Sequence, residues 1–250
     1  MTRLYLHEIR NQQLLFWRTF EAAFFTFLLP IIFLVMLGAV YGDSDIDGIR
    51  GSTFLVAGMI GYGIAASAFA GLGIMLVIRR ESGVLKRVRG TPVPPIVHLG
   101  GVITSILIVV GLNVLLLVLI GHYAFDAAWP ASPASFALEV IIGAIAFAAL
   151  GVAITGLVRS SEGSSAIVNA IYLPMTFLSG AFFSTSSMPA FLQAIADVLP
   201  LTYLLRMLRD SFVNGETIAD QGTNVAVLLA WAAAALLFAL RTFRWEPREA

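Results

Sequence analysis

Residues 79–95 read RRESGVLKRVRGTPVPP, and this stretch decides how the chain is folded. Its first eleven positions hold five of the fifteen basic residues of the chain. Two uncharged apolar runs of about 26 residues each, 53–78 and 96–121, flank it. A helix needs about 20 apolar residues to cross a bilayer, so both runs are long enough. The stretch is therefore a basic loop at one face of a membrane.

The composition agrees with a chain that lies almost wholly in the membrane. Of its 250 residues, 59% are hydrophobic and 12% are charged, and the mean hydropathy is +0.91. Soluble domains carry about 25% charged residues. The chain has no cysteine, which excludes disulfides, thiolate metal sites and cysteine nucleophiles. Its three histidines are too far apart in sequence to suggest a metal site.

Six apolar runs predict six membrane-spanning helices, because long continuous runs do not fit the alternating pattern of a membrane β-barrel. The predicted spans are about 22–40, 53–78, 96–121, 136–158, 163–183 and 225–243. The first run is longer than the apolar core of a signal peptide, so we interpret it as a retained span. The predicted fold class is an all-α polytopic membrane protein, with 1–250 as a single transmembrane domain.

The basic residues set the orientation, since loops on the cytoplasmic side of a membrane are enriched in Lys and Arg. With the N-terminus inside, twelve basic residues are cytoplasmic and three are outside. The twelve are Arg3, Arg10, Arg18, Arg79, Arg80, Lys86, Arg87, Arg89, Arg159, Arg241, Arg244 and Arg248, and the three are Arg50, Arg206 and Arg209. Both termini are therefore predicted to be cytoplasmic.

Segments outside the spans also have recognisable patterns. Residues 1–21 alternate apolar and charged positions and predict an amphipathic helix at the inner interface, with a plain cytoplasmic lead-in as the alternative. Residues 188–199 and 201–213 have apolar residues at helical spacing but are too short to span. They predict a re-entrant helical hairpin on the outer face. The acidic run 43–47 lacks the full ligand set of a calcium loop and predicts a solvated outer loop.

Within the basic loop, the spacing predicts a short helix over residues 81–89. Leu85 and Val88 share one face of it, and a proline ends it. Such a helix offers a surface to a partner protein; contact of its basic residues with anionic lipid headgroups is the alternative. Lys86, the only lysine, lies between Leu85 and Arg87, so the chain has no Gly-Lys-[Ser/Thr] phosphate-binding loop. If nucleotide hydrolysis powers this protein, another chain performs it.

Two motifs carry a resemblance to a known family. Residues 80–93, RESGVLKRVRGTPV, resemble the RE-x-G-T-L-x-x-L-x-x-T-P loop that follows the second span of ABC-2 type transporter permeases. Residues 177–183, FLSGAFF, with Met188-Pro189, Pro200-Leu201-Thr202-Tyr203 and Leu208-Arg209, resemble that family's fifth-span exit and outer hairpin. Both matches fall in one register of six spans, so the resemblance covers essentially the whole chain.

The resemblance implies the permease subunit of an ATP-binding-cassette (ABC) exporter in the bacterial cell membrane, without an enzymatic site of its own. In that family two permease copies, identical or different, each bind a separate ATPase subunit, which holds ATP and Mg. No cofactor is expected in this chain, and the other expected partner is membrane lipid, with no nucleic acid. The chain departs from the family pattern at Val84 and Val88, where threonine and leucine are commoner, and at Ser184-Thr185.

The resemblance also implies roles for individual segments. The loop becomes a coupling helix, and residues 1–21 become an interfacial connecting helix. Arg80 and Glu81 are implied to form polar contacts with the ATPase, while Leu85 and Val88 fill a groove on it. The implied coupling site comprises Arg79, Arg80, Glu81, Ser82, Gly83, Leu85, Lys86, Arg87, Val88 and Arg89.

Polar residues inside spans two and five are candidates for the transport pathway, because such groups tend to face protein or water. By analogy with the family, both spans face the dimer axis. The candidates are Tyr62, Ser67, Asn169, Tyr172 and Thr176, with helix packing as the alternative. Asn113 and Glu139 are expected to have structural roles.

The lack of a charge pair in the spans favours an amphipathic or lipophilic cargo, such as a drug, a natural product or a lipid-linked molecule. Export of a polysaccharide or glycolipid is the alternative. An intramembrane enzyme fits less well, because the spans hold no cluster of catalytic residues. A secondary transporter also fits less well, because the spans are nearly free of the ionisable residues that ion coupling needs.

Overall fold

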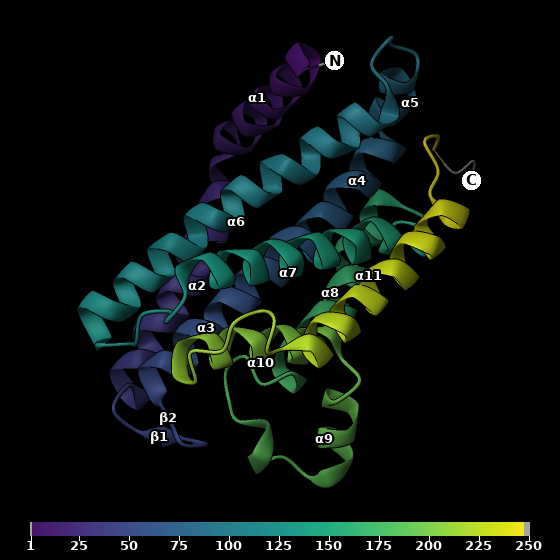
Figure 1. Ribbon diagram of the computed structural model, residues 1–250. Helices are drawn as coiled ribbons and strands as arrows, with labels where there is room; N and C mark the ends of the chain where they lie inside the picture. The colour runs from purple at the N-terminus through teal and green to yellow at the C-terminus, as the bar shows by residue number, and fades with distance from the viewer. Residues whose placement is uncertain (1, 248–250) are drawn as a thin grey trace.

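The computed structural model describes residues 2–247, which form an almost entirely helical membrane domain (Figure 1). Arg248, one of the basic residues assigned to the inner side, lies outside the described residues. The elements are α1 (Thr2–Arg18), α2 (Phe20–Tyr41), β1 (Asp45–Ile46), β2 (Ile49–Arg50), α3 (Gly51–Ile64), η1 (Ala65–Gly71), α4 (Leu72–Glu81), α5 (Val84–Arg89), α6 (Pro95–Phe125), α7 (Pro133–Ile154), α8 (Ser161–Leu178), η2 (Thr185–Ser187), α9 (Ala190–Ala196), α10 (Pro200–Val213) and α11 (Gly222–Thr242).

Five helical segments of the described chain are long and apolar enough to cross a membrane, and they coincide with five predicted spans. They are α2, the continuous segment Gly51–Glu81, α6, α7 and α11. α8 lies where the fifth span is predicted and connects the two ends of the bundle (Figure 1). The predicted outer hairpin is α9 and α10, which meet at an angle of 84°. The fold class of an all-α polytopic membrane protein is confirmed.

The fifth helix ends earlier than the predicted span 163–183. α8 stops at Leu178 because Gly180 adopts a left-handed backbone conformation with φ of +86°, which ends the helix. The residues that follow pack inward instead of continuing the helix. Ala181 and Phe182 are both buried, and the backbone of Ala181 contacts Gly58 of α3 directly. An apolar run thus marks burial here, in a segment that is not helical.

The core of the chain is α3, whose fourteen residues are all buried. It packs against α2, α6 and α10. Small residues allow the close approach, as is common between membrane helices. A methyl group on Gly61 would lie 2.5 Å from Leu205 of α10, and one on Gly63 would lie 2.8 Å from the side-chain oxygen of Asn113 on α6. The first half of span two therefore lies at the centre of the chain, with α2, α6 and α10 packed around it.

A π-helical segment, η1, interrupts span two between α3 and α4. In a π-helix each backbone N–H bonds to the carbonyl five residues earlier, and the Leu72 N–H accordingly reaches the Ser67 carbonyl. Gly151 of α7 allows the two backbones to touch, since a methyl group there would lie 2.5 Å from the Ala68 carbonyl oxygen. Span two thus crosses as one continuous helix with a local change of helical register.

The two ends of the bundle differ in what they carry. Both ends of the described chain and α5 lie at one end, which we call the α5 end, whereas the β1–β2 hairpin and α9 lie at the other (Figure 1). This arrangement agrees with the predicted alternation of the spans. It places the basic loop and both ends of the described chain at the same end of the bundle.

Candidate functional site

The predicted coupling helix is present as α5, on a short turn after α4. It covers Val84–Arg89, so it begins three residues later than predicted. Gly83 precedes it with φ of +73°, a conformation that glycine adopts without strain, and this turns the chain back after α4. At the other end, the Thr91 hydroxyl donates to the Val88 carbonyl at 2.7 Å. The loop is thus an ordered structure with defined boundaries.

Arg80 fastens the base of this loop to the end of α7. Its side chain is 1% exposed, and its guanidinium donates to the carbonyls of Thr155 and Val158, each at 2.8 Å. Its Nε also lies 2.6 Å from the Glu81 carboxylate. A planar guanidinium can serve these three acceptors at once because its donors form a rigid fork. Arg80 is therefore a buried link between α4 and the segment after α7.

Two residues implied to contact the ATPase lie inside the chain instead. Arg80 is turned toward α7, and Leu85 is fully buried. Leu85 cannot fill a groove on a partner in this arrangement, because it already packs against its own chain. In this single chain both residues lie beneath the surface of α5, and their implied contacts with the ATPase stay a prediction.

The surface that α5 does offer is basic. Ser82, Lys86, Arg87 and Arg89 are exposed, and Arg79, Glu81, Gly83 and Val88 are partly exposed. With Arg80 and Leu85 fixed beneath them, these side chains stand on a rigid base. The structure thus divides the ten predicted coupling residues into an inner pair and an outer basic surface.

A polar cluster at the α5 end, which was not predicted from the sequence, joins α1, α4 and α6. Glu8 of α1 lies 2.9 Å from the His98 imidazole on α6, and it accepts a 2.6 Å hydrogen bond from Gln12. Gln12 in turn accepts from Arg79 at 2.8 Å. The signal available in the sequence was the spacing of Glu8 and Gln12, which places both on one face of α1. These bonds connect α1 to α4, the helix that leads into α5.

The candidate pathway residues fall into two groups. Tyr62 and Tyr172 are brought together, with ring centroids 5.8 Å apart, but both are buried. Thr176 is also buried, and its hydroxyl donates to the Tyr172 carbonyl at 2.8 Å. Ser67 and Asn169 are partly exposed. Tyr62 and most of span two therefore lie inside the single chain, and the expectation that span two faces a dimer axis stays a prediction.

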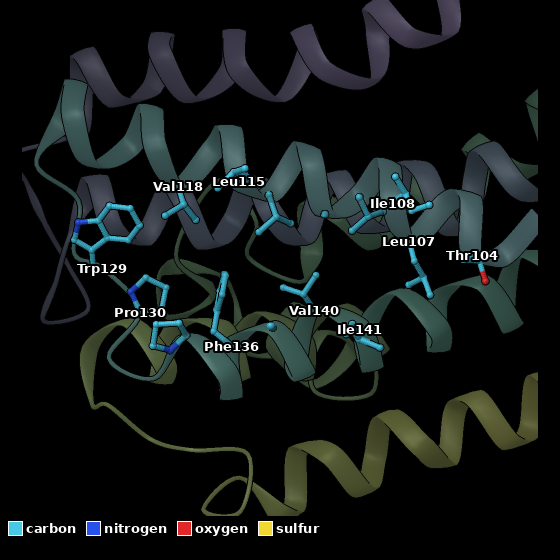
Figure 2. A pocket seen from close by; sticks show the side chains of 15 residues that line it. Thr104, Leu107, Ile108, Leu115, Val118, Trp129, Pro130, Phe136, Val140 and Ile141 are labelled. Carbon is cyan, nitrogen blue, oxygen red and sulfur yellow. The ribbon is translucent and has the colours of Figure 1, made fainter. Parts of the chain in front are cut away.

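An apolar groove of about 500 Å³ runs between α6 and α7 (Figure 2). Among the lining residues, Thr104 carries the only hydroxyl group, and Trp129 lies at the opposite end of the groove (Figure 2). The side walls include Leu107, Ile108, Val118, Phe136 and Val140. Its size is in the range of small-molecule pockets, about 300–1,000 Å³. The chemistry of this groove suits an apolar group and offers almost nothing to a polar one.

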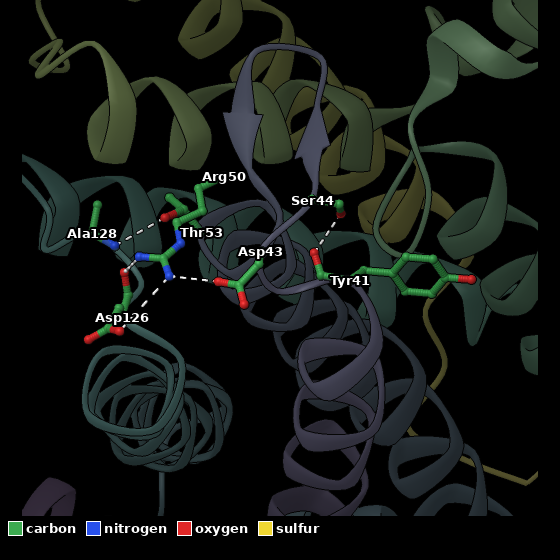
Figure 3. A network of polar contacts seen from close by, with 7 residues as sticks. All are labelled: Tyr41, Asp43, Ser44, Arg50, Thr53, Asp126 and Ala128. Atoms are coloured by element: carbon green, nitrogen blue, oxygen red, sulfur yellow. Dashed lines mark hydrogen bonds and ion pairs between the residues drawn. The ribbon is translucent and has the colours of Figure 1, made fainter.

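The opposite end of the bundle is held by a network around Arg50 (Figure 3). The Arg50 guanidinium lies 2.8 Å from the Asp43 carboxylate and donates to the Asp126 carbonyl at 3.0 Å. Close by, the Ala128 N–H donates to the Thr53 hydroxyl at 3.0 Å. The network joins the β1–β2 hairpin to the loop between α6 and α7, so it fixes the relative positions of spans one, two and three.

The acidic run 43–47, predicted as a solvated loop, is a hairpin bonded to the segment after α8. Asp47 and Gly48 both have positive φ, as a two-residue hairpin turn requires. The Asp47 carboxylate accepts hydrogen bonds from the hydroxyls of Ser184 and Ser186. These bonds, with Ser184 first, hold the pKa of Asp47 below its ordinary value of 3.8. A lowered carboxyl pKa stabilises the folded state above that value, so this link is present at neutral pH and is lost in strong acid.

Comparisons with known proteins find several bacterial relatives of this chain. Nodulation protein J of Rhizobium leguminosarum bv. viciae is 28% identical over 229 residues, which cover 80% of this chain and 77% of the relative. The linearmycin resistance permease protein LnrN of Bacillus subtilis (strain 168) is 25% identical over 191 residues, 72% of this chain and 49% of that relative. The inner membrane transport permease YadH of Escherichia coli (strain K12) is 22% identical over 195 residues, 76% of each chain.

The profile of one family covers most of the chain. It matches residues 4–213, which extend from α1 to the end of α10 and include α5 and the outer hairpin. The matched region thus contains both motifs on which the resemblance was based. This chain belongs to the ABC-2 type transporter family.

Proposed function

We propose that this chain is the transmembrane permease subunit of an ABC exporter, powered by ATP that a separate ATPase subunit hydrolyses. The observation that carries the proposal is α5, a short basic helix at the same end of the bundle as both ends of the described chain, with Arg80 and Leu85 buried beneath it. It stands in a chain whose only lysine has no phosphate-binding loop around it. Family membership supports a transporter role, and α5 supplies the surface on which a partner ATPase would act.

The proposed cargo is amphipathic or lipophilic, such as a drug, a natural product or a lipid-linked molecule. The apolar groove between α6 and α7 and the buried pair Tyr62 and Tyr172 support this choice. Two permease copies would form the complete pathway. Ser67 and Asn169 are already at the surface of the single chain, whereas Tyr62, Tyr172 and Thr176 would join the pathway only after the helices separate.

The proposal is tested by measuring ATP hydrolysis in lipid nanodiscs that contain this chain and the ABC ATPase encoded beside it. We expect lipophilic compounds to stimulate hydrolysis several-fold, and an ATPase variant without its P-loop lysine serves as the control. Stimulation by glycolipids alone would move the cargo to the polysaccharide or glycolipid class. Absence of any complex between the two chains would contradict the proposal as a whole.

The proposed orientation places the α5 end in the cytoplasm, because that end carries most of the basic residues. Lys86 is exposed on α5, and the natural chain has no cysteine to give background labelling. In intact cells, a Lys86→Cys variant is expected to resist a membrane-impermeant maleimide. A matched Ala194→Cys variant, exposed on α9, is expected to be labelled. The reverse pattern would overturn the orientation.

A further inference from the structure

A carboxyl group lies buried in span four, where the fold brings three segments together. Glu139 of α7 is fully buried, six residues after the helix begins, which is about 9 Å along its axis. The Ser211 hydroxyl of α10 lies 2.8 and 2.9 Å from its two oxygens. The Gln221 amide, which immediately precedes α11, donates to Glu139 at 3.4 Å. Glu139 is thus the point where span four, the outer hairpin and span six meet.

No cation compensates this carboxyl group among the described residues. The charged group that acts on Glu139 is Asp210 of α10, which is also acidic. On the same helix, Arg209 donates instead to the Gly180 carbonyl at 2.5 Å, and Arg206 pairs with Asp197. Before α11, Glu216 offers its backbone carbonyl to Ser211, and Asp220 is bonded to Thr217. An ionised carboxylate at this position would be both buried and unpaired, which membrane proteins avoid.

The same cluster contains an acceptor without a donor. Gln221 is buried, and its Nε2 donates to Glu139 and, at 3.2 Å, to the Met207 carbonyl. Its own side-chain oxygen has no hydrogen-bond partner among the described residues. An ionised Glu139 can only accept hydrogen bonds, so it cannot relieve this shortage. A proton on Glu139 removes the buried charge and adds one hydrogen-bond donor to this cluster.

We propose that Glu139 binds a proton and, as a neutral carboxylic acid, is the positioning residue that holds the outer hairpin against span four. A neutral, hydrogen-bonded contact lets α10 leave and rejoin α7 without separating an ion pair. This role concerns how the outer hairpin (α9 and α10) is held against α7. It does not depend on which cargo is moved or on which end of the bundle faces the cytoplasm.

The protonation state is tested by infrared difference spectroscopy on the purified full chain in nanodiscs at neutral pH. We expect the difference between the natural protein and Glu139→Gln to show the carbonyl band of a protonated carboxylic acid. Glutamine keeps the size and supplies an N–H donor, so this variant is expected to fold. A difference spectrum with carboxylate bands only would overturn the proposal.

The positioning role is tested with a cysteine reporter on α10. Leu204 is fully buried and faces α7, since a methyl group on Gly143 would lie 2.6 Å from it. With Leu204→Cys, we expect Glu139→Gln to leave maleimide labelling as slow as in the parent. Glu139→Leu removes the acceptor of the hydrogen bonds from Ser211 and Gln221. It is expected to speed maleimide labelling about tenfold or more. Ala194→Cys, exposed on α9, is expected to label at one rate in all backgrounds.

Two results would overturn the positioning role. The first is equally fast labelling in Glu139→Gln and Glu139→Leu, which would mean that a negative charge is needed. The second is a Glu139→Leu variant that labels no faster than the parent. Met207→Cys, also fully buried on α10, repeats the measurement if the Leu204→Cys chain does not fold. The infrared result stands independently of either reporter.

Discussion

Reversing the charges of Lys86, Arg87 and Arg89 together is expected to abolish co-purification of the ABC ATPase subunit. These three side chains are the exposed basic surface of α5. Like charges placed across an interface cost several kcal/mol, so the affinity should fall on the order of a hundredfold or more. The measurement is pull-down of the ATPase by the tagged permease, with membrane insertion and gel-filtration profile checked in parallel.

A matched control separates this effect from a general change of charge at the α5 end. Arg159, Arg241 and Arg244 are exposed basic residues outside α5, and their reversal changes the net charge by the same amount. This second triple variant is expected to retain the ATPase. Equal loss in both variants, or unchanged capture in the first, would show that α5 is not the binding surface.

Replacing Arg80 by alanine is expected to destabilise the permease by about 3–5 kcal/mol, the usual cost of breaking a buried ion pair by removing one partner. The substitution leaves the Glu81 carboxylate unpaired and deprives the carbonyls of Thr155 and Val158 of their donor. Arg80→Lys is expected to recover only part of the loss, because an ammonium group lacks the guanidinium fork. Thermal unfolding in detergent measures both variants.

Lys86→Ala is the control for Arg80, since Lys86 is exposed and carries the same charge. It should shift stability by less than about 0.5 kcal/mol. A small effect of Arg80→Ala would mean that this guanidinium does not hold α5 in place. We also expect ATP hydrolysis in the Arg80→Ala complex to lose its response to cargo, because the base of α5 is no longer fixed to α7.

The spans could be predicted from the sequence because an uncharged apolar run of about 20 residues rarely forms anything except a membrane-spanning helix. Five of the six runs match helices of spanning length, whereas α8, at the predicted fifth span, is not among those helices and ends early, at Leu178. That end depends on Gly180 and on the packing of Ala181 against α3. Both are consequences of tertiary structure, and hydrophobicity alone does not distinguish a buried helix from a buried irregular segment.

The burial of Arg80 was less visible, although a local signal existed. Gly73, Leu76, Val77 and Arg80 are buried at spacings of three, one and three, which is the inward stripe of a helix. In a loop with five basic residues, this periodicity was outweighed by the expectation that such charges lie in the cytoplasm. The two carbonyl acceptors of Arg80, on Thr155 and Val158, lie more than 70 residues away, so no local pattern could identify them.

Long-range polar contacts were beyond prediction from one sequence. The bonds from Ser184 and Ser186 to Asp47 and the pair of Glu8 with His98 join residues that are distant along the chain. Each residue alone is an ordinary loop or interface residue, and only the folded chain brings the partners together. The structural roles expected for Asn113 and Glu139 agree with the structure, since Asn113 donates to the Thr26 carbonyl at 3.1 Å.

The π-helical segment Ala65–Gly71 has a consequence for rotation about the axis of span two. One residue corresponds to about 100° of rotation in an α-helix. If the N–H groups of this segment exchanged carbonyls five residues back for carbonyls four residues back, α4 would turn about its own axis relative to α3 without breaking the span. α3 is held by neighbours on all sides, whereas α4 carries Arg80 and leads directly into α5. A turn of α4 would therefore move α5 with it and would have to break the bonds from Arg80 to the Thr155 and Val158 carbonyls.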